Sequence, residues 1–268
     1  MRTYRSGLLG AFAAALAFSA HAPRASADLI PAFADSTIQP GGPRTTNGGT
    51  TLVNYFFNIE GGGNGSFASF GVTDFSGLHL GISSLSQLSQ LQLRLTEANA
   101  AFSVAGPINV YLSTDTTTNI GLGSPLRFQA SGAPEGLGTQ LNNALANRIG
   151  SFSFPATGSG GSGRVDTIDL LAGLANLGSS AQAALLASLD NGGTIRLVVA
   201  AENATVAATY AGIGNNTYPN GAPTLAASAS PSAAVPEPAS LVLLSLGALT
   251  LIAGARSRRA PRRLAPRG

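Results

Sequence analysis

The stretch Leu91-Gln92-Leu93-Arg94-Leu95 alternates apolar and polar side chains over five consecutive residues. Successive side chains of a β-strand point to opposite faces, so this pattern predicts a strand with one buried face and one face in water. The same period of two recurs between residues 28 and 234. The other segments that show it are Val53–Ile59, Leu78–Ile82, Ile108–Leu112, Phe152–Phe154, Ile168–Leu170, Ile195–Val199 and Val206–Tyr210.

These segments are separated by stretches rich in Gly, Ser, Asn and Pro. They predict an all-β fold, an antiparallel β-sandwich of jelly-roll type formed by residues 28–225. Gln140–Arg148 and Ser180–Leu189 are rich in Ala and Leu and predict two short helices between strands. The second follows a Ser residue that can act as an N-cap and ends before Asn191-Gly192-Gly193, which is typical of a helix end.

The later half of this region also resembles the jelly-roll modules of secreted bacterial surface proteins. The segments that carry the resemblance are Leu91–Leu95, Val110–Leu112, Phe152–Phe154, Asp166–Leu170, Arg196–Val199 and the ending Ala222–Leu225. The resemblance implies the same sandwich fold and a place outside the cell.

The composition excludes several kinds of chemistry. The 268 residues include no Cys, so disulfides, thiolate zinc sites, iron–sulfur clusters and a Cys nucleophile are absent. Of the two His residues, His21 lies in a segment that we expect to be removed, which leaves only His79. A metal motif with two His residues therefore cannot form in the mature chain.

The net charge of +3 divides unevenly along the chain. Residues 1–27 hold three Arg (+3), and residues 235–268 hold six Arg and one Glu (+5). Residues 28–234 hold six Arg against seven Asp and four Glu, a balance of −5. The basic charge thus lies in the two ends, and the acidic middle part would repel phosphates, so we expect no nucleic-acid partner.

The N-terminal residues 1–27 have the three parts of a secretory signal peptide. Arg2 and Arg5 precede the uncharged run Gly7–Ala20, and Ala25-Ser26-Ala27 offers the small side chains, at Ala25 and Ala27, that signal peptidase accepts. We therefore predict cleavage between Ala27 and Asp28. The alternative is an uncleaved membrane anchor, for which the apolar run is short.

The C-terminal end holds a second apolar segment, the 17 uncharged residues Ala239–Ala255. A helix of this length spans roughly 26 Å, the short end of what crosses a bilayer. The basic cluster Arg256, Arg258 and Arg259 follows and continues into the basic tail 260–268. Because such a cluster stays on the cytoplasmic side, we predict a single transmembrane helix with residues 28–238 outside.

Directly before this segment lies Val235-Pro236-Glu237-Pro238, after a predicted linker at residues 226–234. The order of Val-Pro-Glu-Pro, one short apolar helix and an Arg cluster resembles the PEP-CTERM sorting signal, here residues 235–259. The same segment is also catalogued as an ice-binding-protein C-terminal domain. The alternative is a plain stop-transfer anchor preceded by a Pro-rich turn.

The resemblance implies processing by an exosortase, a transpeptidase-like membrane protease of Gram-negative bacteria. That enzyme cuts near Pro-Glu-Pro, so the protein would reside in the inner membrane transiently and then reach the cell surface or the extracellular matrix. The catalytic residues belong to the exosortase. Pro236 and Pro238 keep the stretch extended, as a protease substrate requires.

Three features of the middle part carry no chemistry by themselves. His79 is predicted on the outward face of a strand, without a marked partner. Gly158–Gly163 lacks the Lys-Ser/Thr end of a phosphate-binding loop and predicts a flexible connection. Thr114-Asp115-Thr116-Thr117-Thr118 is a single cluster and not the repeated Thr rows of an ice-binding face.

Asp166 and Asp169 lie three residues apart, and Asp115 lies in another loop. Carboxylates on sandwich loops can bind calcium, but no Asp-x-Asp-x-Asp-Gly spacing is present, so calcium stays a minor hypothesis and no other cofactor is expected.

The favoured function is a non-enzymatic surface or matrix protein whose body is an adhesion or glycan-binding module. Aromatic rings stack on sugars, and the candidates are Tyr55, Phe56, Tyr111, Tyr210 and Tyr218. Phe56, Tyr111 and Tyr218 are the ones predicted to face outward, and the alternative for all five rings is a role in packing or at the solvent edge. The alternative is a polysaccharide hydrolase, which needs a carboxylate pair that sequence cannot choose from Glu60, Glu97, Glu135 and Glu202.

Overall fold

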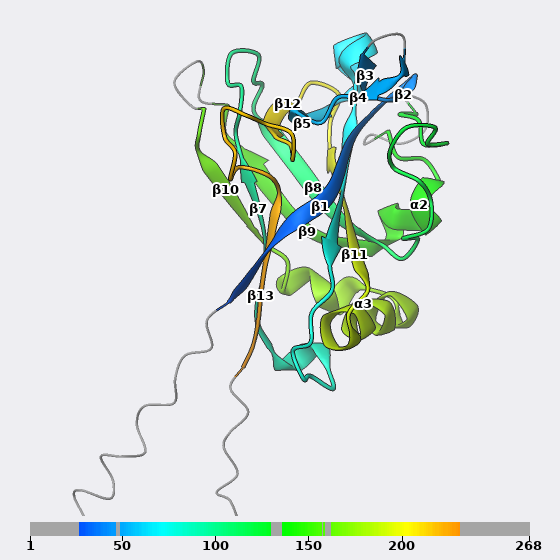
Figure 1. Cartoon of the computed structure of the whole chain (residues 1–268), viewed down its shortest axis with the longest axis vertical. Helices are drawn as coiled ribbons and strands as arrows, with labels where there is room; N and C mark the ends of the chain where they lie inside the picture. Colours follow the sequence, from blue (N-terminus) through cyan, green and yellow to red (C-terminus); the bar gives the residue numbers. More distant parts are fainter. Residues whose placement is uncertain (1–26, 47–48, 130–135, 157, 159–161, 231–268) are drawn as a thin grey trace, which may run out of the picture. The chain divides into compact units, whose positions relative to one another are not determined.

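Strand β1 (Asp28–Gln39) connects the two halves of the main sheet. The computed structural model describes residues 27–46, 49–129, 136–156, 158 and 162–230. The first four residues of β1 pair with β13 (Thr224–Ala229), and the rest of the strand pairs with β6 (Phe70–Ser76) after a register shift between Ala32 and Ala34. β1 thereby passes from one half of the sheet to the other (Figure 1).

The main sheet has nine strands, all paired antiparallel. Its order is β10 (Val165–Asp169), β7 (Leu88–Thr96), β13, β1, β6, β11 (Thr194–Ala201), β8 (Gly106–Ser113) and β9 (Arg148–Phe154), and β2 (Gly42–Pro43) pairs with the end of β1. The sheet nearly closes on itself. At Gly150 of β9, an added Cβ would lie 2.7 Å from Leu170, directly after β10. The predicted antiparallel all-β sandwich is confirmed.

The larger hydrophobic cluster fills the inside of this curved sheet. It joins side chains such as Leu93, Ile108 and Leu197 from strands of both halves. The pair β5 (Phe56–Glu60) and β12 (Ala207–Ala211) covers one end of it, with Phe57 and Tyr210 buried. Helix α3 (Ser179–Asn191) packs at the other end in Figure 1. Both clusters and every strand pairing described lie between residues 28 and 230.

A second hydrophobic cluster covers the opposite face of β6, β11 and β8. Phe70, Tyr111 and Val198 project from these strands into it. Residues 120–129 and 136–145 lie over them with Leu126, Phe128, Leu137 and Leu141. These three strands are therefore buried on both faces, unlike the one-faced strands that the sequence predicted.

A buried ion pair lies at the border of this second cluster. Asp74 of β6 and Arg196 of β11 stand opposite each other, and Arg196 Nε and Nη2 donate to the two carboxylate oxygens at 2.7 and 2.8 Å. Arg196 Nη1 also donates to the carbonyls of Asp115 and Thr118 at 3.0 and 2.8 Å. One guanidinium thus joins two central strands to the loop that follows β8.

The remaining elements are short. They are β3 (Thr45–Thr46), β4 (Thr51–Leu52), α2 (Gln140–Asn143) and the 3₁₀ helices η2 (Gly62–Phe67), η3 (Leu85–Gln87), η4 (Ala144–Asn147) and η6 (Ala172–Asn176). β3 and β4 pair with each other.

Some predicted elements differ from the structure. Leu78–Ile82 is no strand, because the backbone amides of Leu78 and Leu80 donate to carbonyls at the end of α3 and not to a neighbouring strand. Of the predicted strand Val53–Ile59, only the part from Phe56 onward is a strand, β5. The short β4 lies just before this segment.

The helix predicted at Gln140–Arg148 is also wrong in its detail. Leu141, Asn142 and Asn143 have positive φ angles near 54°, a 3₁₀ turn follows, and Arg148 already begins β9. Helix α3 is confirmed and is followed by Gly192 with φ of 81°, but its N-cap is Gly178, without a side-chain cap. β13 extends to Ala229, so residues 226–229, predicted as linker, belong to the sheet.

Candidate functional site

The outer face of the β5–β12 pair carries the polar and aromatic side chains of the candidate site. In register, Phe56 stands opposite Ala211, Asn58 opposite Thr209 and Glu60 opposite Ala207. Because strands alternate, Phe57, Ile59 and Tyr210 point into the core while Asn58, Glu60 and Thr209 point outward. The buried ring of Phe57 lies directly against Gly71 of β6, where a Cβ would come within 2.2 Å of it. This contact holds the pair down on the sheet.

A cavity of about 630 Å³ opens over this outer face. This size is within the range of small-ligand sites. Its walls come from five segments: Arg44 between β2 and β3, the strand β5, the turn η2, the loop between β7 and β8, and the strand β12. The lining residues are Arg44, Phe56, Asn58, Glu60, Asn64, Phe67, Asn99, Ala101, Phe102, Ser103, Val104, Ala207 and Thr209.

Asn58 organises the floor of the cavity. Its Nδ2 donates to Glu60 Oε1 at 2.8 Å and to Thr209 Oγ1 at 3.2 Å, and its Oδ1 accepts from Arg44 Nη1 at 3.1 Å. Its backbone amide donates to Thr37 Oγ1 of β1 at 3.0 Å, which ties the floor to the main sheet. The polar groups are therefore positioned before any ligand arrives.

Glu60 is a partly desolvated carboxylate. Burial raises the pKa of Glu60, while the hydrogen bond from Asn58 and the charge of Arg44 act in the opposite direction. Among the residues described, only Asn58 donates a side-chain hydrogen bond to this carboxylate. An oxygen of Glu60 and further N–H groups of Arg44 thus remain to bind hydroxyl groups.

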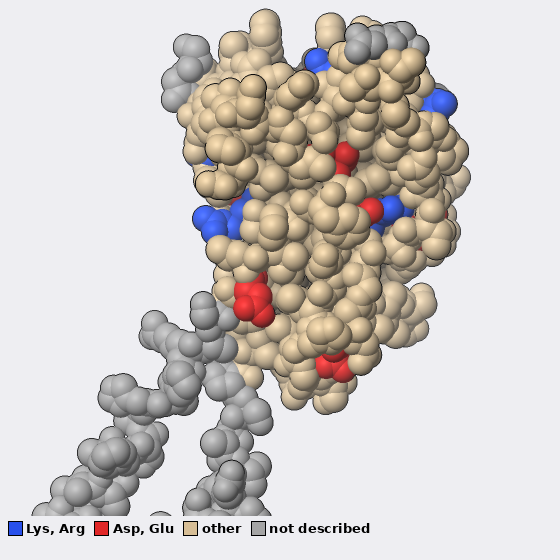
Figure 2. Space-filling model, in the orientation of Figure 1, with Lys and Arg blue, Asp and Glu red and all other residues tan. Residues whose placement is uncertain are grey.

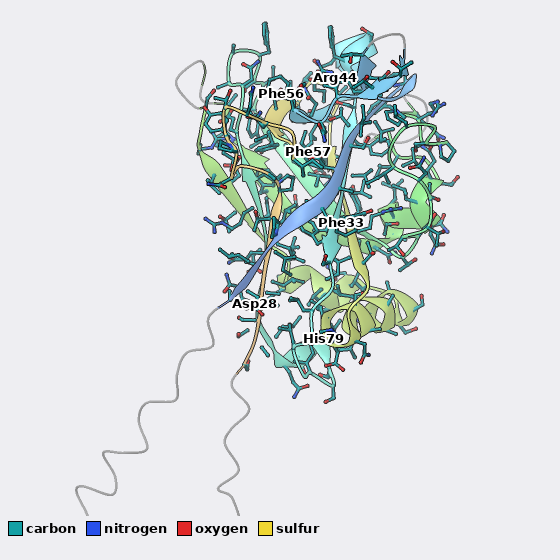
Figure 3. The ribbon with its side chains drawn as sticks, in the orientation of Figure 1. Asp28, Phe33, Arg44, Phe56, Phe57 and His79 are labelled. Carbon is teal, nitrogen blue, oxygen red and sulfur yellow. The ribbon has the colours of Figure 1, made fainter. Side chains whose placement is uncertain are left out.

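Aromatic side chains form the rim. Phe67 and Phe102 are 62% and 81% exposed, and Phe56 of β5 also lines the cavity. Exposed Phe side chains on a well-packed body are unfavourable in water unless something covers them. Figure 3 shows Arg44 and Phe56 near the β5–β12 end, far from Asp28.

The predicted aromatic candidates divide in three ways. Phe56 lines the cavity as expected, and Tyr55 is exposed beside it. Tyr111 is buried in the second cluster, so its predicted outward position is wrong, because side chains from residues 120–129 and 136–145 cover that face. Tyr210 is buried and donates to Asp166 Oδ2 at 2.9 Å, and Tyr218 is half-buried.

Of the Glu candidates that the structure describes, Glu60 is the one that lines the cavity. Glu97 is completely buried and its Oε2 lies 2.8 Å from Arg164 Nη1. Glu60 lines the cavity, Glu202 is exposed, and Glu135 lies outside the described residues. Ser103, on the wall of the cavity, donates to Glu97 Oε1 at 3.0 Å, so Glu97 supports the wall from behind.

The three Asp candidates for calcium do not come together either. Asp166 binds Arg164 through both oxygens at 2.9 Å, and Asp169 Oδ1 accepts from the amide of Leu171. Asp115 accepts hydrogen bonds from Thr117 and Thr118, and the one donated by the Thr118 hydroxyl contributes most to lowering the pKa of Asp115 to about 2. Within the described ranges, no group of three or more His, Asp or Glu side chains could hold a metal ion.

The remaining sequence features have structural surroundings. His79 is exposed, in a loop and not on a strand, and its Nδ1 lies 3.1 Å from the carbonyl of Asp190. The Thr114–Thr118 cluster is a turn around Asp115. Of the loop Gly158–Gly163, residues 159–161 lie outside the described part.

Sequence reasoning did not find Arg44, Asn58, Phe67, Phe102 or Thr209. The alternation of Asn58 with Phe57 and Ile59 was a signal that Asn58 points outward from a strand. No comparable signal marked the other four residues. They come together only in the folded chain, where β5 pairs with β12 although β12 follows about 150 residues later.

The predicted processing and sorting residues lie almost entirely outside the described part. They are Ala25, Val235, Pro236, Glu237, Pro238, Arg256, Arg258 and Arg259 and the apolar segment 239–255. Ala27 is described, and β1 begins at Asp28, the residue after the predicted cleavage site. Among the described residues, no helix has the length and apolar character needed to span a membrane.

Comparison with known families gives one match. Residues 234–259 match the family model of the PEP-CTERM protein-sorting motif. No curated protein matches the chain. The motif implies that the protein is a substrate of an exosortase and is exported through the membrane to the cell surface.

Proposed function

We propose that the exported body is a non-enzymatic glycan-binding module, used for adhesion at the cell surface or in the extracellular matrix. The observation that carries the proposal is the cavity on β5 and β12, where exposed Phe67 and Phe102 surround a preformed floor of Asn58, Glu60 and Thr209. Aromatic faces stack on sugar C–H surfaces, and fixed amide, carboxylate and hydroxyl groups bind sugar hydroxyls.

The position of the cavity supports a role in adhesion. β13, the last strand before the C-terminal segment, ends at Ala229, and in Figure 1 this end lies away from β5 and β12. A body attached through its C-terminal side would therefore present the cavity away from the attachment point. A ligand on another cell or in the matrix could reach it there.

The carboxylates support binding over hydrolysis. A glycoside hydrolase needs two carboxyl groups roughly 5–10 Å apart across the sugar. Among the described residues, Glu60 alone contributes a carboxylate to the lining of this cavity, while Glu97 and Asp166 are engaged by Arg164. With a single carboxylate in the lining, we propose that binding needs neither calcium nor another metal ion.

A glycan array tests the proposal. The full chain, purified in a detergent without a sugar headgroup, should bind a set of glycans, with and without calcium, and leave their length unchanged. Phe67→Ser/Phe102→Ser should weaken binding at least about fivefold, since each stacking ring contributes about 0.5–1.5 kcal/mol. Phe33→Ser removes a similarly exposed ring (54%) outside the cavity and should bind like the wild type. No binding to any glycan, or equal loss in both variants, would contradict the proposal.

The sorting signal is tested by Pro236→Ala/Glu237→Ala/Pro238→Ala. This variant keeps the apolar segment 239–255 and the Arg cluster, so it should still insert in the membrane. We expect full-length protein to accumulate in the membrane fraction and surface exposure to fall severalfold. Pro261→Ala/Pro266→Ala removes two prolines outside the motif and should sort normally. Normal surface delivery of the first variant would show that the motif is only a turn.

A further inference from the structure

A second cavity of about 430 Å³ lies next to the first and shares two of its lining residues, Phe56 and Asn99. Its other walls are Tyr55 and the segments around Ala98 and Asn215–Thr217. The two cavities therefore adjoin at Phe56 and Asn99. From this arrangement, which rests on the proposed glycan-binding function, we infer that the ligand is an extended, uncharged polysaccharide chain that occupies both cavities.

The second cavity has a fixed wall. Asn215 is buried, and its Nδ2 donates to the carbonyl of Tyr55 at 2.7 Å while its Oδ1 accepts from the amides of Thr217 and Tyr218. The amide of Gly212 donates to the same carbonyl at 3.1 Å. A Cβ at Gly212 would lie 2.2 Å from the carbonyl oxygen of Asn54, so the loop packs directly on the start of β5. The wall is therefore in place before binding.

The junction between the cavities suits a chain that continues from one to the other. Phe56 offers an apolar ring at this point, and Asn99 Oδ1 accepts from the amide of Ala101 at 3.0 Å. Asn99 Nδ2 donates to no residue described, so it can donate to a sugar hydroxyl. Tyr55, 53% exposed, provides a further ring in the lining of the second cavity. The aromatic rings of Phe102, Phe56 and Tyr55 thus line the proposed path of the polysaccharide.

The charged side chains around the two cavities favour an uncharged polysaccharide as the ligand. The first cavity holds one positive and one negative side chain, Arg44 and Glu60, and the second is lined by none. Residues 28–234 have a net charge of −5, which disfavours a polyanion. Figure 2 shows a face with few charged side chains. Hydroxyl groups, not carboxylates or sulfates, fit this surface.

Length dependence tests the inference. Isothermal titration of the full chain would compare di- and hexasaccharides of neutral β-1,4-glucan, α-1,4-glucan and β-1,4-mannan, with a hyaluronan hexasaccharide as the charged probe. We expect one neutral hexasaccharide to bind at least about tenfold tighter than its disaccharide, because two cavities are filled instead of one. The charged hexasaccharide should bind more weakly than the neutral one.

Tyr55→Ala tests whether the additional affinity for the hexasaccharide comes from the second cavity. It should weaken hexasaccharide binding severalfold and leave disaccharide binding unchanged, while Phe33→Ala should change neither. Equal affinity for short and long oligomers, or preference for the charged probe, would overturn this inference and leave the glycan-binding proposal standing. No binding of any probe here, together with an empty glycan array, would instead contradict the proposed function itself.

Discussion

Replacing Arg196 with Met should lower the free energy of unfolding of the body, residues 28–230, by about 3–5 kcal/mol. The change leaves the Asp74 carboxylate, which is 4% exposed, without its partner between β6 and β11. It also removes the donor to the carbonyls of Asp115 and Thr118. Urea unfolding followed by far-UV circular dichroism measures the effect.

Two further variants make this prediction specific. Arg148→Met removes an exposed Arg of β9 and should change the unfolding free energy by no more than about 0.5 kcal/mol. Asp74→Leu/Arg196→Met removes both charges and should recover about 2 kcal/mol of the loss, because no unpaired charge remains in the core. A single Arg196→Met variant as stable as the wild type would show that the ion pair does not stabilise the fold.

Asp35→Asn should stabilise the body at pH 8 and have little effect at pH 4. Burial raises the pKa of Asp35 to about 7, although the amide of Ile213 donates to Oδ2 at 2.8 Å and acts against the rise. Its Oδ1 is buried and has no hydrogen-bond partner among the described residues. An Asn at this position keeps the acceptor for Ile213 and carries no charge to desolvate.

The direction of this pH dependence follows from the protonation of Asp35 in the unfolded and in the folded chain. In the unfolded chain Asp ionises near pH 4, whereas in the folded body this carboxyl keeps its proton to about pH 7. Raising the pH between these values therefore destabilises the wild type, by up to about 4 kcal/mol in total. The advantage of Asp35→Asn should grow over this window and then level off.

Urea unfolding at pH 4, 6 and 8 checks this dependence. Asp169→Asn removes an exposed carboxylate of β10 and controls for the loss of one negative charge. An advantage of Asp35→Asn that is equal at all three pH values would show that Asp35 does not change its protonation on folding.

β7 and β10, which have one polar face, were predictable from their period of two, and so were β8 and β11, although these two are buried on both faces. β1 was not found, because Pro31 interrupts its apolar pattern and its inner face carries Asp35 and Thr37, which bond to the loop after β12 and to β5. The polar residues that hide this strand in the sequence are the ones that bind the β5–β12 pair to the sheet.

The candidate site was predictable only in part. Phe56 was identified as an outward aromatic residue, but the sequence does not show that β5 pairs with β12 or that Phe67 and Phe102 lie beside it. A cavity of this kind is made by long-range pairing. The sorting motif differs in this respect, because it is recognised as one continuous segment and needs no tertiary contacts to be identified.

Chemical-shift mapping of the ¹⁵N-labelled body, residues 28–230, tests most directly whether the surface of β5 and β12 binds glycan. The body would be titrated with the neutral oligosaccharide that binds tightest. We predict that the perturbed backbone amides cluster at residues 55–60, 99–104 and 207–217, the segments that line the two cavities. Perturbations centred instead on the opposite end, around His79 and α3, would contradict the assignment of the site.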